Sequence, residues 1–213
     1  MKDLLFSSWQ GQIIDNRGKE SEDFASVDQV ALPEYFKPGE EIKALMGWGG
    51  ITIRSAEVNI LDLCRAYIEA VSEHTNTCDK CNYCKTGFTE MLEVFRDLIN
   101  GEAREDDPEF LQTAATTIIG SSKCTIGKEG PVPILHALKY FREDFSHAIN
   151  EKCQVASGRY YSKLTAPCMD ACPIHLDVPR YIERIKEAKF ADSLGVIREA
   201  LPLPGVVGRI CYH

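Results

Sequence analysis

Three cysteines lie within seven residues near the middle of the chain, where residues 78–84 read Cys-Asp-Lys-Cys-Asn-Tyr-Cys. A spacing of three residues inside a turn lets successive thiolates point toward a common centre. A fourth cysteine, Cys124, follows forty residues after Cys84. Any fold of this chain must therefore accommodate a cysteine-rich turn and one distant cysteine.

The composition favours metal binding by these cysteines over disulfide formation. The chain has 213 residues and nine cysteines, enough for one or two domains. Neither a signal-peptide core nor an apolar run of about 20 residues is present, so we expect a cytoplasmic protein without a membrane span. Thiols stay reduced in that compartment. The net charge of −8 argues against a nucleic-acid partner, which requires a basic face.

Apolar residues recur at helical spacing in four segments, which predicts four amphipathic helices. These helices are expected over about 60–71, 86–100, 107–120 and 134–149. Asp107 followed by Pro108 is typical of a helix start. Cys64 lies inside the first apolar stripe and is therefore interpreted as a core residue. Before these helices, the alternation in residues 51–54 predicts a short strand.

The remaining segments suggest a second, smaller helical block. Asp177 is expected to cap a helix with Pro179 in its first turn, and a further short helix is predicted over 190–200. The predicted fold class is mainly α: a short β element, a four-helix bundle carrying a metal cluster at one end, and this block. The expected division is an extended arm or lead-in over 1–41, the bundle domain over 42–150, a linker over 151–165 and the block over 166–213.

The positions of the four cysteines within this bundle suggest one metal site. Cys78, Cys81 and Cys84 lie in the turn between the first two helices, and Cys124 follows the third. Antiparallel helices would bring both turns to the same end. Three cysteines from one loop and one remote cysteine are typical of a [4Fe–4S] cluster. Two alternatives remain. The site could hold zinc, which is usually bound by two separated C-x2-C pairs, or the thiols could bind no metal. Four lysines lie beside these cysteines: Lys80, Lys85, Lys123 and Lys128. Either their positive charges raise the reduction potential of the cluster, or they are simply solvated.

Several motifs in order resemble a known family. They are Met46-Gly47-Trp48-Gly49-Gly50-Ile51, the cysteine triplet, Ser122-Lys123-Cys124-Thr125-Ile126-Gly127 and Pro131-Val132-Pro133. Over about 42–150 the chain resembles the C-terminal iron–sulfur domain of the NADH-binding flavoprotein subunit of respiratory complex I and of NAD-reducing hydrogenases and formate dehydrogenases. The resemblance implies that the four cysteines ligate one [4Fe–4S] cluster that takes electrons from a flavin.

This sequence departs from that family in two ways. Tyr83 and Lys85 stand where the family usually has proline and arginine. The glycine-rich segment that holds flavin and nicotinamide in the family is missing, and no phosphate-cradling loop replaces it. We therefore expect no FMN, FAD or NAD on this chain.

A second cysteine motif, Cys168-Met169-Asp170-Ala171-Cys172-Pro173, is followed by Gly208-Arg209-Ile210-Cys211. Over about 164–213 the chain resembles the iron–sulfur domain that precedes the flavin-binding part of the glutamate synthase small subunit and dihydropyrimidine dehydrogenase. The resemblance implies that Cys168 and Cys211 share one cluster and that Cys172 belongs to another.

Neither of these two clusters has four ligands in this sequence. Tyr160 and Lys163 stand where that family has a C-x2-C pair, and its later cysteines have no counterpart after His213. This second block is therefore expected either to be part of a truncated or divided protein or to build a site that is completed by Cys153, His213 or another chain.

These observations predict an electron-transfer iron–sulfur subunit or fragment of a cytoplasmic NAD(P)H-linked flavoprotein oxidoreductase complex. Its expected partners are flavoprotein or other redox subunits, and it would be a non-catalytic component, because no general acid, base or nucleophile is assigned. The alternative is a zinc-stabilised helical interaction module without redox activity.

Overall fold

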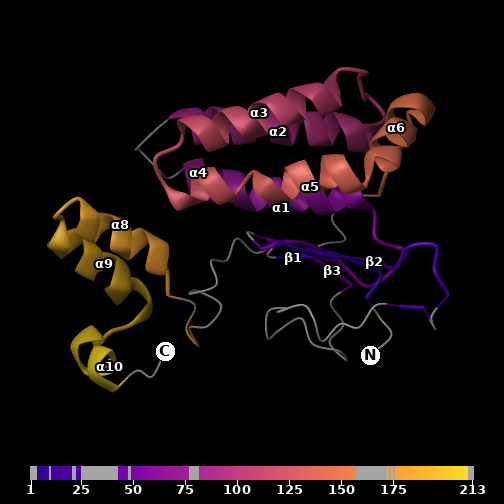
Figure 1. Cartoon of the computed structure of the whole chain (residues 1–213). Coiled ribbons are helices and arrows are strands. Elements are labelled where there is room, and N and C mark those ends of the chain that lie inside the picture. Colours follow the sequence, from indigo (N-terminus) through magenta and orange to yellow (C-terminus); the bar gives the residue numbers. More distant parts are fainter. Residues whose placement is uncertain are drawn as a thin grey trace. The chain divides into compact units, whose positions relative to one another are not determined.

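The computed structural model describes residues 4–9, 11–20, 23–24, 43–47, 49–76, 82–156, 172, 174 and 176–210. The chain divides into two compact units, Met1–Leu164 and Thr165–His213. Helices dominate both units, and a small antiparallel sheet belongs to the first (Figure 1). The predicted mainly helical class is therefore confirmed.

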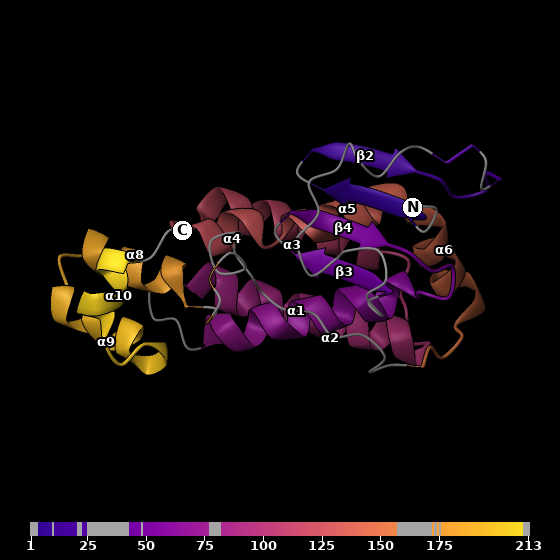
Figure 2. The ribbon, with the colours of Figure 1, turned by 90° about the horizontal axis from the view of Figure 1, so that it is seen from below.

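The sheet consists of two β-hairpins, and one strand of each hairpin pairs with one strand of the other. Its strands are β1 (Phe6–Trp9), β2 (Gln12–Asp15), β3 (Ala44–Gly47) and β4 (Gly50–Ile53). The order is β2-β1-β4-β3, and all neighbours are antiparallel, as Figure 2 shows. Phe6 lies opposite Ile53 where the hairpins meet. Strand β4 confirms the strand expected from the alternation after Gly50.

Strands β1 and β2 differ from the extended arm expected for residues 1–41. They were missed because β1 carries two polar residues, so its four residues show no apolar alternation. Both polar side chains are buried but hydrogen-bonded: Ser7 Oγ lies 3.1 Å from Thr52 Oγ1, and Ser8 Oγ lies 3.0 Å from His136 Nδ1. These partners come from segments far away in the sequence, so tertiary contacts make the strand stable.

The helices of the first unit stack beside the sheet, with α1 and α5 in contact with its strands (Figure 1). They are α1 (Ile60–Asn76), α2 (Asn82–Asn100), α3 (Asp107–Ser121), α4 (Thr125–Glu129), α5 (Val132–Tyr140) and α6 (Arg142–Glu151). The predicted stripes form the core, in which Tyr67, Phe88 and Phe95 are fully buried. Cys64 is also fully buried in α1, which confirms its interpretation as a core residue. The third helix has Asp106 rather than Asp107 at its N-cap, although its proline lies in the first turn as expected.

The prediction of one helix over 134–149 is wrong, because the chain leaves helical geometry at Phe141 (φ −124°, ψ 32°). Arg17 contacts the residues at this break. Its guanidinium stacks over the rings of Phe6 and Phe141, at 4.8 and 4.5 Å from their centroids, and its Nη1 donates to the carbonyl of Tyr140 at 2.9 Å. The cation–π contacts and the hydrogen bond fasten the β1–β2 hairpin to the junction of α5 and α6.

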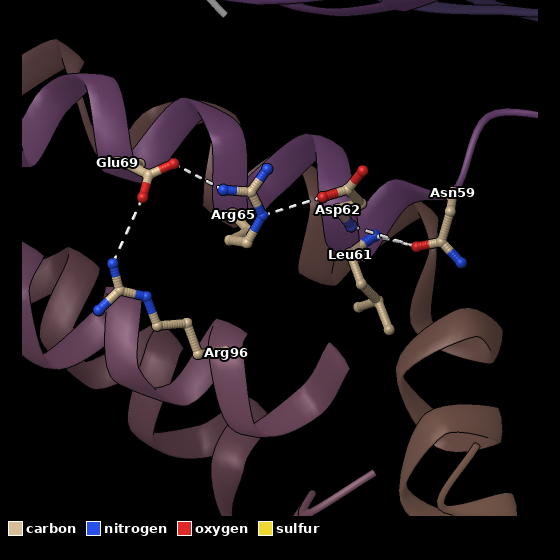
Figure 3. Close-up of polar contacts among 6 residues, drawn as sticks. All are labelled: Asn59, Leu61, Asp62, Arg65, Glu69 and Arg96. Atoms are coloured by element: carbon tan, nitrogen blue, oxygen red, sulfur yellow. Dashed lines mark hydrogen bonds and ion pairs between the residues drawn. The ribbon is translucent and has the colours of Figure 1, made fainter. Parts of the chain in front are cut away.

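A chain of charged side chains connects α1 with α2 (Figure 3). Asn59 Oδ1 caps α1 by accepting from the N–H groups of Leu61 and Asp62, at 2.9 and 3.2 Å. The buried Asp62 pairs with Arg65 at 2.9 Å, and Glu69 bridges Arg65, at 2.6 Å, to Arg96 of α2, at 3.3 Å. These contacts add a polar link between the two helices that flank residues 77–81, which pack through their apolar stripes.

The second unit contains α8 (Val178–Lys186), α9 (Phe190–Ala200) and α10 (Pro204–Ile210). Asp177 Oδ1 accepts from the N–H of Arg180 at 3.1 Å, which confirms the predicted cap. Helix α10 was not predicted, although its first residue is Pro204 and proline is well suited to a first helical position. Among the described helices of the chain, none is long and apolar enough to cross a membrane.

Candidate metal centre

Cys84 is the third residue of α2 and is 5% exposed. Its position follows from the apolar stripe of α2, since Phe88, one turn later, lies on the same buried face. The other two cysteines of the triplet, Cys78 and Cys81, lie outside the described residues. The structure thus places one of the three clustered thiols at the start of a helix, facing the interior.

Cys124 directly precedes α4 and has an extended backbone (φ −117°, ψ 165°). Its carbonyl accepts from the N–H of Lys128 at 3.2 Å, and its side chain makes no capping hydrogen bond to α4. The side chain is half-buried. Cys124 therefore starts the helix through its backbone, while its sulfur is not used as a cap.

The segment that carries Cys124 contacts the start of α2 directly. Ser122 Oγ lies 3.0 Å from Cys84 Sγ, and both residues are buried. Helix α4 accordingly lies at the end of the unit where α2 begins (Figure 1). The expectation that the segments of Cys84 and Cys124 meet at one end of the helices agrees with this contact.

Gly127 allows α4 to approach Cys84 closely. A Cβ at this position would lie 2.6 Å from Cys84 Sγ and would also overlap the side chain of Ser122. Only glycine fits here without moving these buried groups. The first-turn N–H groups of a helix have no partner within the helix, so the α4 backbone offers hydrogen-bond donors next to the thiol.

Two further contacts hold α4 in place. The hydroxyl of Tyr67 donates to the carbonyl of Gly130 at 2.8 Å, in the buried interior. Burial raises the pKa of the Tyr67 phenol, so it stays a protonated donor throughout the physiological pH range. Phe88 packs against Gly130, where a Cβ would lie 3.1 Å from the ring. Helices α1 and α2 therefore both position the segment that follows Cys124.

Three of the four lysines next to the cysteines are described by the structure. Lys85, Lys123 and Lys128 are exposed, and Lys80 lies outside the described residues. Exposed charges act on a buried group through water and salt, which weakens their field. The exposure of these three favours the interpretation that they are solvated.

The other cysteines lie elsewhere. Burial raises the pKa of the Cys64 thiol, which therefore stays protonated and is unsuited to metal binding. Cys153 is exposed after α6, and Cys172 is half-buried in the second unit. Cys168 and Cys211, like His213, lie outside the described residues. Within the described part of the chain, no three Cys, His, Asp or Glu side chains gather in a metal-binding group.

The described half of the centre fits a group bound by thiolates. Cys84 contacts the segment that carries Cys124 through Ser122, and Gly127 packs too closely against Cys84 and Ser122 to accept a larger side chain. Soft thiolate ligands select iron–sulfur clusters or zinc rather than hard cations. From the sequence, Ser122 and Gly127 were recognised only as part of a motif, and neither was given a role. Their fixed positions around Cys124 were the signal that could have identified them.

Comparison with known families agrees with this interpretation. The family model described as NADH-ubiquinone oxidoreductase-F iron-sulfur binding region matches residues 62–148. A second one, described as dihydropyrimidine dehydrogenase domain II, 4Fe-4S cluster, matches residues 137–213. Both resemblances that the sequence motifs suggested are thereby confirmed.

Relatives match the chain as well, and some of them cover its whole length. The NADPH-Fe(3+) oxidoreductase subunit beta of Geobacter sulfurreducens is 38% identical over 215 residues, covering 100% of this chain and 31% of that protein. The NADP(+)-dependent formate dehydrogenase subunit beta of Moorella thermoacetica is 28% identical over 250 residues, covering 100% and 34%. The NADP-reducing hydrogenase subunit HndC of Solidesulfovibrio fructosivorans is 23% identical over 112 residues, covering 52% and 22%.

The chain spans about a third of the length of the first two relatives. The two family models confirm the predicted iron–sulfur regions, and the relatives are named as subunits of NADPH- or NADP(+)-linked oxidoreductases or of an NADP-reducing hydrogenase. Residues 62–148 are thus similar to the iron–sulfur binding region of NADH-ubiquinone oxidoreductase-F, and residues 137–213 are similar to domain II of dihydropyrimidine dehydrogenase.

Proposed function

We propose that this chain carries electrons within an NAD(P)H-linked flavoprotein oxidoreductase through a [4Fe–4S] cluster held by Cys78, Cys81, Cys84 and Cys124. The cluster would supply one-electron transfer, and the protein would bind it, exclude water and adjust its reduction potential. The proposal places this site at one end of the helices of the first unit.

The contact between Cys84 and Ser122 is the observation that supports this proposal. It joins the helix that carries the last cysteine of the triplet to the segment of the distant cysteine, although Cys84 and Cys124 are forty residues apart in the sequence. The sequence alone leaves that convergence open. One of these two thiols is buried and the other is half-buried, so the access of water to the site is limited. Limited access of water lets the surrounding protein control the reduction potential of a bound redox group.

We propose that the second unit binds a further cluster. The match to a 4Fe-4S domain over residues 137–213 supports this proposal, and Cys168, Cys172 and Cys211 are the candidate ligands. Since they provide three sulfurs, the remaining ligands would come from Cys153, His213 or another chain. Flavin and nicotinamide would bind to a flavoprotein partner or to a further domain, and the whole assembly would work in the cytoplasm.

Quantitation of iron, acid-labile sulfide and zinc in the anaerobically purified chain tests the cluster assignment. Four iron and four sulfide per chain are expected from the first site alone, and eight of each if the second is complete. The protein should be brown and should bleach on reduction by dithionite. A colourless chain with one zinc per molecule would contradict the proposal and favour the zinc-stabilised interaction module.

Single cysteine variants identify the ligands. Cys84→Ala and Cys124→Ala should each lose the iron of the first site, because a thiolate ligand has been removed. Cys153→Ala is the matched control, since this cysteine is exposed, and it should keep that site's iron and its spectrum. Retention of the complete first-site cluster in Cys84→Ala would refute the proposed ligand set.

A further inference from the structure

The side chain of Ser122 touches a candidate cluster ligand in the described structure. Its hydroxyl oxygen lies 3.0 Å from Cys84 Sγ, and the residue is 6% exposed. A buried hydroxyl is costly unless it makes a hydrogen bond. The contact with Cys84 Sγ therefore satisfies the hydroxyl of Ser122.

The direction of this hydrogen bond depends on the state of the cysteine. A neutral thiol can donate to the serine oxygen or accept from it. A cysteine that ligates a metal is a thiolate and has no proton to donate. In the cluster-bound chain, therefore, the Ser122 hydroxyl must be the donor and Cys84 Sγ the acceptor.

The backbone around Ser122 fixes the hydroxyl in this position. Ser122 is the C-cap of α3, and its N–H donates to the carbonyl of Ile118 at 2.9 Å. On the other side, Gly127 packs so closely that a Cβ there would overlap Ser122. The end of α3 and the start of α4 thus both hold the serine against the sulfur.

We propose that Ser122 is a positioning residue that donates a hydrogen bond to the Cys84 thiolate and raises the reduction potential of the cluster. This inference rests on the proposed function. Reduction adds negative charge that is shared with the ligand sulfurs, so a donor stabilises the reduced form more than the oxidised form. The hydroxyl also holds Cys84 Sγ in the orientation needed for ligation.

The midpoint potential of the first-site cluster tests this role directly. Ser122→Ala removes the donor, so the oxidised-to-reduced ratio at a fixed ambient potential should rise about tenfold, equivalent to about 59 mV for one electron. The potential is measured by a dithionite titration of the full chain, followed by electron paramagnetic resonance. Ser122→Thr keeps a hydroxyl and should restore most of the wild-type potential.

Ser121→Ala is the matched control, because this neighbouring serine is half-buried at the end of α3 and its removal leaves the Cys84 contact intact. Its potential should equal that of the wild type. Resonance Raman spectra of chains reconstituted in H2O and D2O give a second readout. The Fe–S(Cys) bands should shift in D2O in the wild type and shift less in Ser122→Ala.

The outcomes separate this inference from the proposed function. A wild-type chain without iron refutes the proposed function itself. A loaded Ser122→Ala chain with the wild-type potential and the wild-type D2O shift overturns the role of Ser122. If Ser122→Ala does not bind the cluster, the test moves to two other measurements. Retention of iron in Ser122→Thr would show that the hydroxyl is required for binding. Fe–S(Cys) bands of the wild type that do not shift in D2O would refute the proposed hydrogen bond.

Discussion

Gly127 provides the sharpest test of how α4 packs against Cys84. In Gly127→Ala the new Cβ would lie 2.6 Å from Cys84 Sγ and would overlap Ser122. Both neighbours are short, buried side chains, so relief requires the backbone of α4 to move. Overpacking of this kind lowers the free energy of unfolding by up to about 3 kcal/mol. The better helix propensity of alanine raises it by about 1 kcal/mol. The expected net loss is about 2 kcal/mol.

Gly120→Ala is the matched control for this substitution. Gly120 is also helical, is exposed, and would place a Cβ within 4 Å of nothing. It should stabilise the chain by up to about 1 kcal/mol through helix propensity alone. The two alanine variants are therefore expected to change stability in opposite directions.

Tryptophan fluorescence in a urea titration measures this difference. Both tryptophans of the chain, Trp9 and Trp48, belong to the first unit, so the signal reports the unfolding of that unit. Gly127→Ala should also bind less iron than the wild type, since displacement of α4 moves Cys124 away from Cys84. A Gly127→Ala chain with wild-type urea midpoint and iron content would refute the packing described here.

Three further predictions concern the surrounding structure. Tyr67→Phe removes the donor to the Gly130 carbonyl and should lower the free energy of unfolding by about 1–3 kcal/mol in the same titration; an unchanged midpoint would contradict it. Gly50→Ala should destabilise the sheet more than Gly18→Ala does. Gly50 has φ +129°, and a Cβ there would overlap the Ser8 carbonyl. A Cβ at Gly18 would meet no neighbour, so that variant is strained only by its φ of +72°. Burial lowers the pKa of His136, so the unfolded chain binds more protons below about pH 6.5, and stability should fall as the pH drops through that range. The slope of stability against pH should be smaller in His136→Asn, and an equal slope would exclude this histidine as its source.

The helices of the first unit were predictable because periodicity reports burial. Cys64, Phe88 and Phe95 lie on apolar stripes, and the core consists of these same stripes. The positions of Cys84 and of the Cys124 segment at one end of the helices followed from the same patterns and from helix order. Local sequence was sufficient wherever a side chain's environment depended on its own helix.

Features that depend on distant partners were not predictable in this way. The apolar stripe continues through Phe141, yet the helix breaks there, and the freed carbonyl of Tyr140 accepts a hydrogen bond from Arg17, more than 120 residues earlier. Strand β1 depends on partners in β4 and α5 for its buried serines. Ser122 and Gly127 acquire their roles only when α4 packs against α2. Each case requires a contact that periodicity does not encode.

The central claim is that the sulfurs of Cys84 and Cys124 bind the same inorganic group. An anomalous difference map at the iron absorption edge, from crystals of the anaerobically purified chain, measures this directly. We expect one iron-containing peak bonded to both Sγ atoms, with Cys78 and Cys81 completing its ligands. A peak bonded to only one of the two sulfurs, or one that appears at the zinc edge and not at the iron edge, would contradict the account.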